Sequence, residues 1–510
     1  MDKIVVLDFG SQYSHLICRR IRESNVYCEL LPFNSPASVI KKLQPKGIVL
    51  SGGPSSVYQK GSPKPDIKIF KMGIPVLGIC YGHQLIVDHF NGKIKRFDNR
   101  EYGYSDLVID NNSDLFKGIN KKIKCWMSHA DAAEIIPNDF EILAHTENSH
   151  SAAIANRVRK FYGIQFHPEV SHTEEGNRIL RNFSQAISKA KPDWTMQSFI
   201  DFSIKDIKNK VGDSRVLCAI SGGIDSTTLA VLLNKAIGKN LTCVFVNNGL
   251  LRLNEEIQVH ELINKYLGIN TIKINAEERF LSNLKGISDP EQKRKIIGEE
   301  FAQVFVEVTR DYGPFQWLAQ GTLYPDVIES GLSKGPAAVI KTHHNVGGLP
   351  EWLNLEVLEP FRSLYKDEVR QIAALLEIPD EIIKRHPFPG PGLAVRIIGE
   401  VTDEKIRIVR QASNIVENEL MTSGWYNKVW QAYAAVGDDL AVGVLGDERV
   451  YGHIVTVRIV ESLDAMTADW SRIPYDLLSK ISNRITNEIN GVTWVTYTIS
   501  SKPPATIEPQ

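Results

Sequence analysis

Short apolar runs alternate with amphipathic stretches along roughly the first 185 residues. Four of these runs occupy positions 4–7, 47–50, 75–79 and 161–166. The stretch 12–23, which follows the first run, carries the spacing of an amphipathic helix. Continuous apolar strands that are separated by helices predict a mostly parallel sheet covered on both faces.

The same alternation starts again in the middle of the chain. Apolar runs lie at 215–220, 241–246 and 316–319, and a helical pattern begins at Ser226. These runs predict a second doubly wound, mostly parallel α/β domain. Two later runs, 454–460 and 492–499, flank helical stretches; together these elements indicate a small α+β domain.

Two segments suggest where these domains meet. The polar stretch 188–193 interrupts the first alternating pattern. The segment 385–392 contains three prolines and two glycines, which cannot lie inside one helix or one central strand. We therefore expect domains at 1–190, 191–386 and 387–510.

Length and composition agree with a folded chain of several domains. The 510 residues are too many for one hydrophobic core, and 43 % of them are hydrophobic. Balanced charge, with 59 basic and 60 acidic residues, gives no overall attraction to nucleic acids or anionic membranes. The N-terminus lacks the apolar core of a secretory signal, and the six cysteines form no CxxC pair. We expect a cytoplasmic enzyme with neither nucleic-acid nor membrane partners.

A cysteine stands where a predicted strand turns into a helix. In Gly78-Ile79-Cys80-Tyr81-Gly82 the small flanking residues suit a sharp, strained turn that presents a nucleophile. The N-terminus of the following helix would favour the thiolate of Cys80. A buried structural cysteine between two turn glycines explains the same five residues equally well.

A histidine and a glutamate follow the last strand of the same domain. Ligands and catalytic groups gather at the carboxyl ends of parallel strands. There His167 can accept the thiol proton, and Glu169 can orient the imidazole across Pro168. Ser51-Gly52-Gly53-Pro54 follows another strand and could offer backbone N–H groups to an oxyanion, although an ordinary tight turn has the same sequence.

Together these residues resemble the class I, triad-type glutamine amidotransferases over roughly residues 3–190. The resemblance implies that Cys80 attacks the glutamine amide, that His167 is base and acid, and that Glu169 orients His167. It also implies oxyanion and glutamine contacts from Gly53, Tyr81, Gln84, Ser128, His129 and Asp131. Ala130 replaces the glycine that is usual in this family's segment between His129 and Asp131.

A second loop suits a phosphate group. Ser221-Gly222-Gly223-Ile224-Asp225-Ser226 joins a predicted strand to a predicted helix, so its N–H groups and hydroxyls can converge on an anion. Asp225 beside phosphate requires an intervening cation, which predicts Mg²⁺. An N-capping serine in an ordinary turn is the simpler alternative. The chain contains no G-x-x-x-x-G-K-[ST] motif.

This string resembles the PP-loop ATP pyrophosphatases, which cleave ATP between its α- and β-phosphates. The resemblance implies that ATP is a substrate and that the loop holds the departing pyrophosphate. The residues implied at the ATP site are Ser221, Gly222, Gly223, Ile224, Asp225, Ser226, Thr227, Val246 and Gly321.

The whole chain resembles the family of glutamine-hydrolysing GMP synthetases. The strings that carry this resemblance are 245–252, 319–322, 324–330, 340–348 and 501–508. It implies that ATP adenylates O2 of XMP, that ammonia from glutamine displaces AMP to give GMP, and that the C-terminal domain forms a homodimer. Two departures stand out: Asn247 where the family commonly has aspartate, and a tail that ends Glu508-Pro509-Gln510.

The resemblance also assigns residues to a lid and to the XMP site. The lid residues are Asp326, Glu329, Lys341 and His343. The XMP residues are Arg252, Pro389, Gly390, Pro391, Asp447, Arg449, Lys502, Ile507 and Glu508. Without the resemblance, the lid residues are typical of an exposed loop, and Pro389–Pro391 is typical of a domain hinge. The alternative function is a PP-loop enzyme that modifies tRNA, for which a basic docking surface would be expected.

Overall fold

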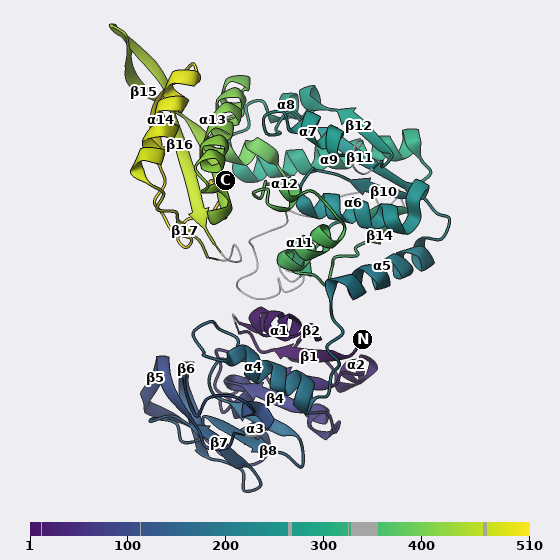
Figure 1. The fold of residues 1–510 in the computed structure, drawn as a ribbon, viewed down its shortest axis with the longest axis vertical. Coiled ribbons are helices and arrows are strands. Elements are labelled where there is room, and N and C mark those ends of the chain that lie inside the picture. The colour runs from purple at the N-terminus through teal and green to yellow at the C-terminus, as the bar shows by residue number, and fades with distance from the viewer. Residues whose placement is uncertain (12, 113, 264–267, 325, 328–354, 463–466) are drawn as a thin grey trace. The chain divides into compact units, whose positions relative to one another are not determined.

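The chain is described by a computed structural model that covers residues 1–510 except 12, 113, 264–267, 325, 328–354 and 463–466 (Figure 1). It divides into two compact units, Met1–Ser198 and Phe199–Gln510. No helix in the described part of the chain is long and apolar enough to cross a membrane.

The first unit is built on a nine-stranded sheet with the order β2-β1-β3-β4-β9-β8-β7-β5-β6. Its parallel part consists of β1 (Lys3–Asp8), β2 (Tyr27–Pro32), β3 (Gly47–Leu50), β4 (Val76–Ile79) and β9 (Phe161–Ile164). Its helices are α1 (Ser14–Glu23), α2 (Ala37–Lys42), α3 (Tyr81–His89) and α4 (Gly176–Arg181).

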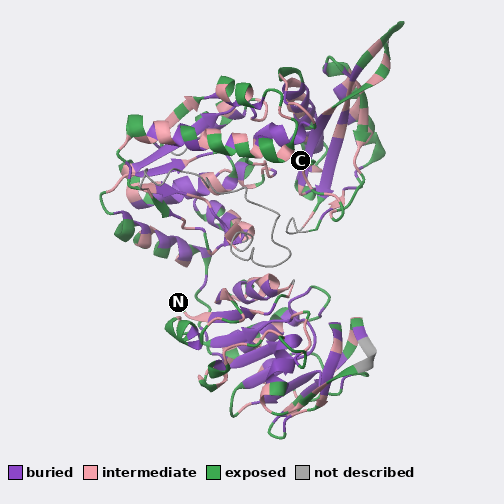
Figure 2. Cartoon of the chain, turned by 180° about the vertical axis from the view of Figure 1, so that it is seen from behind, coloured by how far each residue is buried: buried purple, intermediate pink, exposed green. Residues whose placement is uncertain are grey.

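Alternate side chains of the central strand β1 enter two different cores. Ile4 and Val6 belong to one buried cluster, whereas Val5 and Leu7 belong to another. Because successive side chains of a strand point to opposite faces, both faces of the sheet are covered. Figure 2 shows these strands as buried ribbons. The predicted α/β class is therefore confirmed for this unit.

The other half of this sheet is antiparallel and was not expected from the sequence. It consists of β5 (Lys93–Ile109), β6 (Lys122–Ile135), β7 (Glu141–His145) and β8 (Ala153–Asn156). In β6, buried residues alternate with more exposed ones from Lys122 to Ala130, and residues 101–107 of β5 also alternate between lower and higher exposure, as a sheet with one solvated face requires. This extension carries the segment Ser128–Asp131.

The second unit begins with a five-stranded, fully parallel sheet of order β12-β11-β10-β13-β14. Its strands are β10 (Val216–Ala219), β11 (Leu241–Asn247), β12 (Thr271–Asn275), β13 (Trp317–Ala319) and β14 (Glu356–Leu358). The described helices around it are α5 (Met196–Val211), α6 (Ile224–Ile237), α7 (Glu255–Leu262), α8 (Glu277–Leu284), α9 (Pro290–Tyr312), α11 (Lys366–Leu375) and α12 (Asp380–Ile383).

A mixed sheet packed on helices ends the chain, as the predicted small α+β domain requires. Its elements are α13 (Asp403–Thr422), β15 (Gln431–Leu445), β16 (Glu448–Glu461), β17 (Asp469–Trp470), α14 (Tyr475–Glu488) and β18 (Val492–Tyr497). One buried cluster contains both Leu217 of β10 and Val455 of β16. A shared core explains why residues 199–510 form one compact unit, and the division at 386/387 stays a prediction.

Two candidate active sites

Cys80 lies on a strained turn between β4 and α3. Its φ is 52° and its ψ is −103°, a conformation that L-residues rarely adopt. A Cβ on Gly78 would lie 2.3 Å from the carbonyl oxygen of Gly82, and one on Gly82 would lie 2.2 Å from that of Leu50. Only glycines fit on both sides, so the sequence spacing has a steric cause.

His167 joins Cys80 to Glu169 in one contiguous set. Nδ1 of His167 lies 2.8 Å from Oε1 of Glu169, and the ring also forms a hydrogen bond with Cys80. Both side chains of the histidine–glutamate pair are almost fully buried. The loop after β9 holds them in place because the N–H of His167 donates to the carbonyl of Trp126, and Arg20 donates to the carbonyl of Glu169.

The electrostatics of this set favour proton transfer from the thiol. Burial lowers the pKa of His167, but the carboxylate of Glu169 and the hydrogen bond with Cys80 outweigh burial and hold that pKa well above its ordinary value. An imidazole of raised basicity beside a thiol can hold the thiol proton. Cys80, His167 and Glu169 can therefore work as a nucleophile, a base and an orienting carboxylate.

Two backbone segments stand beside the thiol where an oxyanion would form. A Cβ on Gly52 would lie 3.2 Å from Cε1 of His167 and 3.7 Å from Cβ of Cys80. Its neighbour Gly53, which the resemblance selects, packs against the backbone of Phe9 instead. Tyr81 is the first residue of α3, where helix N–H groups have no partner within the helix.

The predicted glutamine-binding residues converge on Cys80 as well. The thiol lies 3.8 Å from the carbonyl oxygen of Ser128, to which it donates. Nε2 of Gln84 donates to the carbonyl of Asp131 at 2.9 Å, and the hydroxyl of Tyr58 donates to the carboxylate of Asp131 at 2.9 Å. His129 forms a buried contact with Glu101. The structure thus brings α3 and the edge strand β6 together around the thiol.

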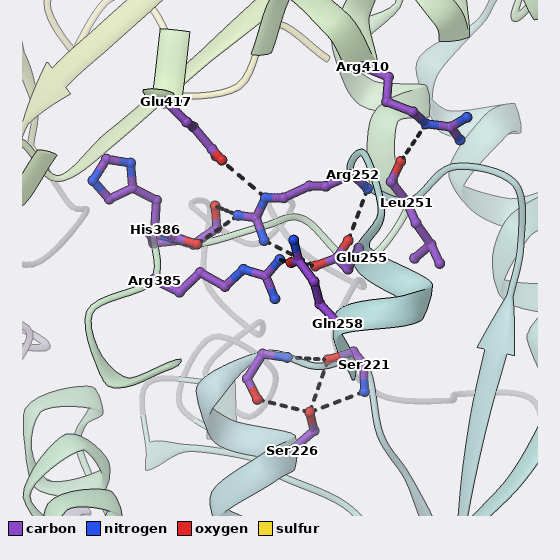
Figure 3. Close-up of polar contacts among 12 residues, drawn as sticks. Ser221, Ser226, Leu251, Arg252, Glu255, Gln258, Arg385, His386, Arg410 and Glu417 are labelled. Carbon is purple, nitrogen blue, oxygen red and sulfur yellow. Dashed lines mark hydrogen bonds and ion pairs between the residues drawn. The ribbon is translucent and has the colours of Figure 1, made fainter. Parts of the chain in front are cut away.

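The serine–glycine loop connects β10 to α6 in the second unit. The hydroxyls of Ser221 and Ser226 lie 3.0 Å apart, and Ser226 also accepts from the N–H of Ser221 and donates to the carbonyl of Gly223 (Figure 3). Gly222 has φ +78°, and a Cβ there would lie 2.2 Å from Cγ2 of Val259. The hydrogen bonds between Ser221 and Ser226 join the first and last residues of the loop. The loop lies at the N-terminus of α6, where an anion can bind.

Asp225 faces a cation that sequence reasoning missed. Its Oδ2 forms an ion pair with Nζ of Lys366, the first residue of α11. Gly321 lies against Asp225: a Cβ on that glycine would be in van der Waals contact, 3.7 Å from Cβ of Asp225. The predicted ATP residues Thr227 and Val246 are buried behind the loop, on α6 and β11.

Asn247 has a local physical reason for replacing aspartate. Its amide nitrogen lies 3.2 Å from Oε2 of Glu256 and 3.4 Å from Oε2 of Glu277, and donates to both. An aspartate here would place a third carboxylate between those two and leave them without this donor. The amide therefore removes a repulsion that this chain's own glutamates would create.

Most of the predicted lid falls outside the described residues. Glu329, Lys341 and His343 belong to the segment 328–354. Asp326 is described, and its carboxylate accepts from the backbone N–H of Leu323 at 2.9 Å. Their joint action on ATP stays a prediction.

Arg252 anchors the proline-rich loop that was predicted to touch XMP. It donates to the carbonyls of His386 at 2.8 Å and Pro387 at 3.4 Å, and it pairs with Glu255 and Glu417 (Figure 3). Only 9 % of its side chain is exposed. Arg252 is thus held by groups of the protein itself, and it supports the proline-rich loop through two backbone carbonyls.

The C-terminal tail meets the same loop through two residues that the sequence did not single out. Nε2 of Gln431 donates to the carbonyl of Pro387 at 3.2 Å and to Oε1 of Glu508 at 2.6 Å. Arg396 donates to both oxygens of Glu508 at 3.1 and 3.0 Å. The carbonyl of Ile507 accepts from the hydroxyl of Tyr433. No local pattern in the sequence marks Gln431 or Arg396 as a site residue.

The remaining XMP candidates are not all in one place. Lys502 pairs through its backbone with Ala468, and Gly390 is exposed on the loop. Asp447 and Arg449 lie at the turn between β15 and β16, where Val444 is in register with Arg449. Glu508 contacts Gln431 at the start of β15, about 13 residues or roughly 40 Å from that turn. Within one chain, Asp447 and Arg449 therefore lie far from the C-terminal tail.

An open cavity of about 1040 Å³ borders the loop at Arg385 and His386. Its wall contains four cationic side chains: Arg370, Lys384, Arg385 and Lys428. Two carboxylates, Glu461 and Asp469, also line it. The excess of cations suits an anionic molecule.

Comparison with known families finds matches in both units of the chain. The model of class I glutamine amidotransferases matches residues 5–187, the model of NAD synthase matches residues 196–302, and the GMP synthase C-terminal domain matches residues 418–509. The chain is thus an amidotransferase joined to an ATP-dependent synthetase.

Whole-length relatives agree. The chain is 54 % identical over 507 residues to a glutamine-hydrolyzing GMP synthase of Caldanaerobacter subterraneus subsp. tengcongensis, with 99 % of both chains covered. It is 52 % identical to proteins of the same name from Clostridium novyi, with 99 % of both chains covered, and from Brachyspira hyodysenteriae, with 100 % of this chain and 99 % of that protein covered. The chain belongs to the family of glutamine-hydrolyzing GMP synthases. This membership favours the synthetase prediction over a tRNA-modifying PP-loop enzyme.

Proposed function

We propose that this chain makes GMP from XMP, with ATP as the activating substrate and glutamine as the nitrogen donor. Glutamine loses its amide nitrogen in the first unit. ATP transfers AMP to XMP in the second unit, and ammonia then replaces that AMP. The observation that carries this proposal is the joint presence of the Cys80–His167–Glu169 set and the Ser221–Ser226 loop in one chain of this family.

In the first unit, Cys80 attacks the carbonyl carbon of the glutamine side-chain amide. His167 takes the thiol proton and passes it to the leaving nitrogen, so that ammonia departs and a glutamyl thioester remains. Water then attacks the thioester, His167 removes a proton from that water, and glutamate leaves with the thiol restored. Glu169 holds the ring in position throughout, and N–H groups of the Gly52–Gly53 turn and Tyr81 stabilise the oxyanion.

In the second unit, the Ser221–Ser226 loop holds the β- and γ-phosphates while O2 of XMP attacks the α-phosphorus. Pyrophosphate leaves and an O-adenylated purine forms. Ammonia adds at C2 and AMP departs, which gives GMP. Lys366 can move from Asp225 to a phosphate oxygen, which compensates for the lysine that a Walker loop would supply.

The residues present fit a magnesium ion shared with the phosphates. Oδ1 of Asp225 is buried without a hydrogen-bond partner. No group of three or more His, Cys, Asp or Glu side chains that could hold a metal occurs among the described residues. Asp225 and phosphate oxygens would therefore hold Mg²⁺ together, and the ion would neutralise charge on the leaving pyrophosphate.

XMP would meet the loop 386–391 and the tail. Arg396, Gln431 and Glu508 form a connected polar network beside Pro387, and the cationic cavity adjoins the same loop. These groups provide both the hydrogen bonds that a purine requires and the positive charge that a 5′-phosphate requires.

A homodimer through the C-terminal domain is also part of this proposal. Leu440, Val442 and Val444 alternate along β15, so that they share one face of the hairpin, and all three are exposed. Tyr451, which is in register with Val442, and Trp494 of β18 extend the exposed apolar surface. A second copy of the same hairpin would bury it.

The division of labour is tested by Cys80→Ala. The variant should lose glutamine-dependent GMP formation completely, because no other thiol lies at the site, and it should keep GMP formation from added ammonium at the wild-type rate. Exposed His150→Gln, in the same unit, serves as the control and should leave both activities unchanged. Loss of both activities in a folded Cys80→Ala protein would refute the proposal.

A further inference from the structure

The antiparallel extension of the first unit buries a carboxylate that the steps above do not use. Glu101 of β5 is 5 % exposed and is in register with His129 of β6. Its Oε2 lies 3.1 Å from Nε2 of His129, and its Oε1 accepts from the hydroxyl of Thr146 at 2.9 Å. Asn148 provides a further side-chain hydrogen bond.

A buried carboxylate is tolerated only when donors satisfy its oxygens. Burial raises the pKa of Glu101, but the hydrogen bonds from His129 and Thr146 outweigh burial, so that its pKa lies below the ordinary value. Glu101 is therefore ionised at neutral pH. An anion that accepts directional bonds from two elements holds those elements in one register.

His129 belongs to the segment that forms the wall of the thiol site. Ser128 accepts from the Cys80 thiol, and Asp131 is held by Gln84 of α3 and by Tyr58. These contacts hold the two ends of the segment, and Glu101 holds His129, one of the two residues between them. Without Glu101 the His129 side chain would lose its charged partner inside a buried site.

We propose that Glu101 is a positioning residue for glutamine: it orients His129 and thereby holds Ser128–Asp131 in the conformation that binds the substrate beside Cys80. The inference rests on the proposed hydrolysis of glutamine and adds a residue outside the predicted set. Glu101 does not touch the reacting atoms, so its effect falls on substrate binding more than on bond breaking.

The test uses the full-length chain and two backgrounds. In wild-type background, Glu101→Gln keeps the size of the side chain and removes its charge, and the KM and kcat for glutamine are measured together with ammonium-dependent GMP formation. In Cys80→Ala background, which cannot form the thioester, glutamine binding is measured by calorimetry with and without Glu101→Gln.

The matched control is Glu134→Gln. Glu134 lies on β6, where it pairs with Lys93 and Lys95 of β5 on the surface. It tests whether loss of any carboxylate from this pair of strands has the same effect. Glu101→Asp, which restores the charge on a shorter side chain, should recover part of the loss.

We expect Glu101→Gln to raise the KM for glutamine and the dissociation constant in Cys80→Ala about tenfold, the consequence of a lost charge-assisted hydrogen bond. The kcat should fall less than the KM rises, and ammonium-dependent synthesis should not change. Unchanged glutamine binding, or an equal effect of Glu134→Gln, would overturn the inference. A wild-type chain that does not hydrolyse glutamine would instead refute the proposed function.

Discussion

Two buried histidines of the first unit show that the surroundings of a side chain decide its chemistry. Glu169 and Cys80 hold the pKa of His167 well above its ordinary value. His83, three residues after the nucleophile, is fully buried, and burial together with nearby His129 lowers its pKa to about 3. The His167 ring is therefore the more basic of the two, whereas the His83 ring stays neutral and packs against Gly163.

The low pKa of His83 predicts acid sensitivity. The unfolded chain binds a proton near pH 6.5 and the folded chain does not until about pH 3, so stability falls as the pH drops through this interval. From pH 7 to pH 5 this single group should cost about 2 kcal/mol. The free energy of unfolding of His83→Gln, measured with urea at both pH values, should fall between pH 7 and pH 5 by about 2 kcal/mol less than that of the wild type.

Exposed His150→Gln is the control for this experiment, since His150 lies on the surface of the same unit. Its loss of stability between pH 7 and pH 5 should equal that of the wild type. An acid sensitivity of His83→Gln that matches the wild type would contradict the assignment of this group.

Among the secondary-structure elements, the exposed hairpin β15–β16 leads to a testable prediction about dimerisation. If a second copy covers it, Leu440→Asp with Val444→Asp should convert a dimer into a monomer, because each copy would place two charges in an apolar contact. Sedimentation velocity at micromolar concentration measures this. Val158→Asp, an equally simple change at a valine that is 94 % exposed in the other unit, should leave the dimer intact. A wild-type monomer would contradict the proposed interface.

The elements also show what the sequence could and could not predict. The parallel strands β1, β3, β4 and β9 are continuous apolar runs, and their order places Cys80 and His167 at one sheet edge, so the elbow and the histidine were both predictable. The strand β5 is rich in charges and alternates, and the pairing of Glu101 with His129 depends on register across 28 residues. Long-range register of this kind leaves no local signal.

The same limit applies in the second unit. Ser221–Ser226 follows from local glycine and serine chemistry, but the ion pair of Asp225 with Lys366 joins residues 141 positions apart. Arg396, Gln431 and Glu508 likewise meet only through the fold. Asn247 was visible as a departure, and the reason for it, two neighbouring glutamates, required the structure.

In the whole molecule, the two units divide the reaction between them. The first makes ammonia from an amide, and the second makes a carbonyl oxygen into a leaving group at the cost of one ATP. Neither unit alone makes GMP from XMP and glutamine. The proposed reaction requires that the Ser221–Ser226 loop releases pyrophosphate and that the nitrogen of glutamine reaches the purine.

The most direct test incubates the chain with XMP, ATP, Mg²⁺ and glutamine labelled with ¹⁵N in its amide. The proposed reaction should yield GMP that carries the label at its exocyclic nitrogen, with one AMP and one pyrophosphate formed for each GMP. Formation of ADP and orthophosphate in place of AMP and pyrophosphate, or GMP without the label, would contradict it.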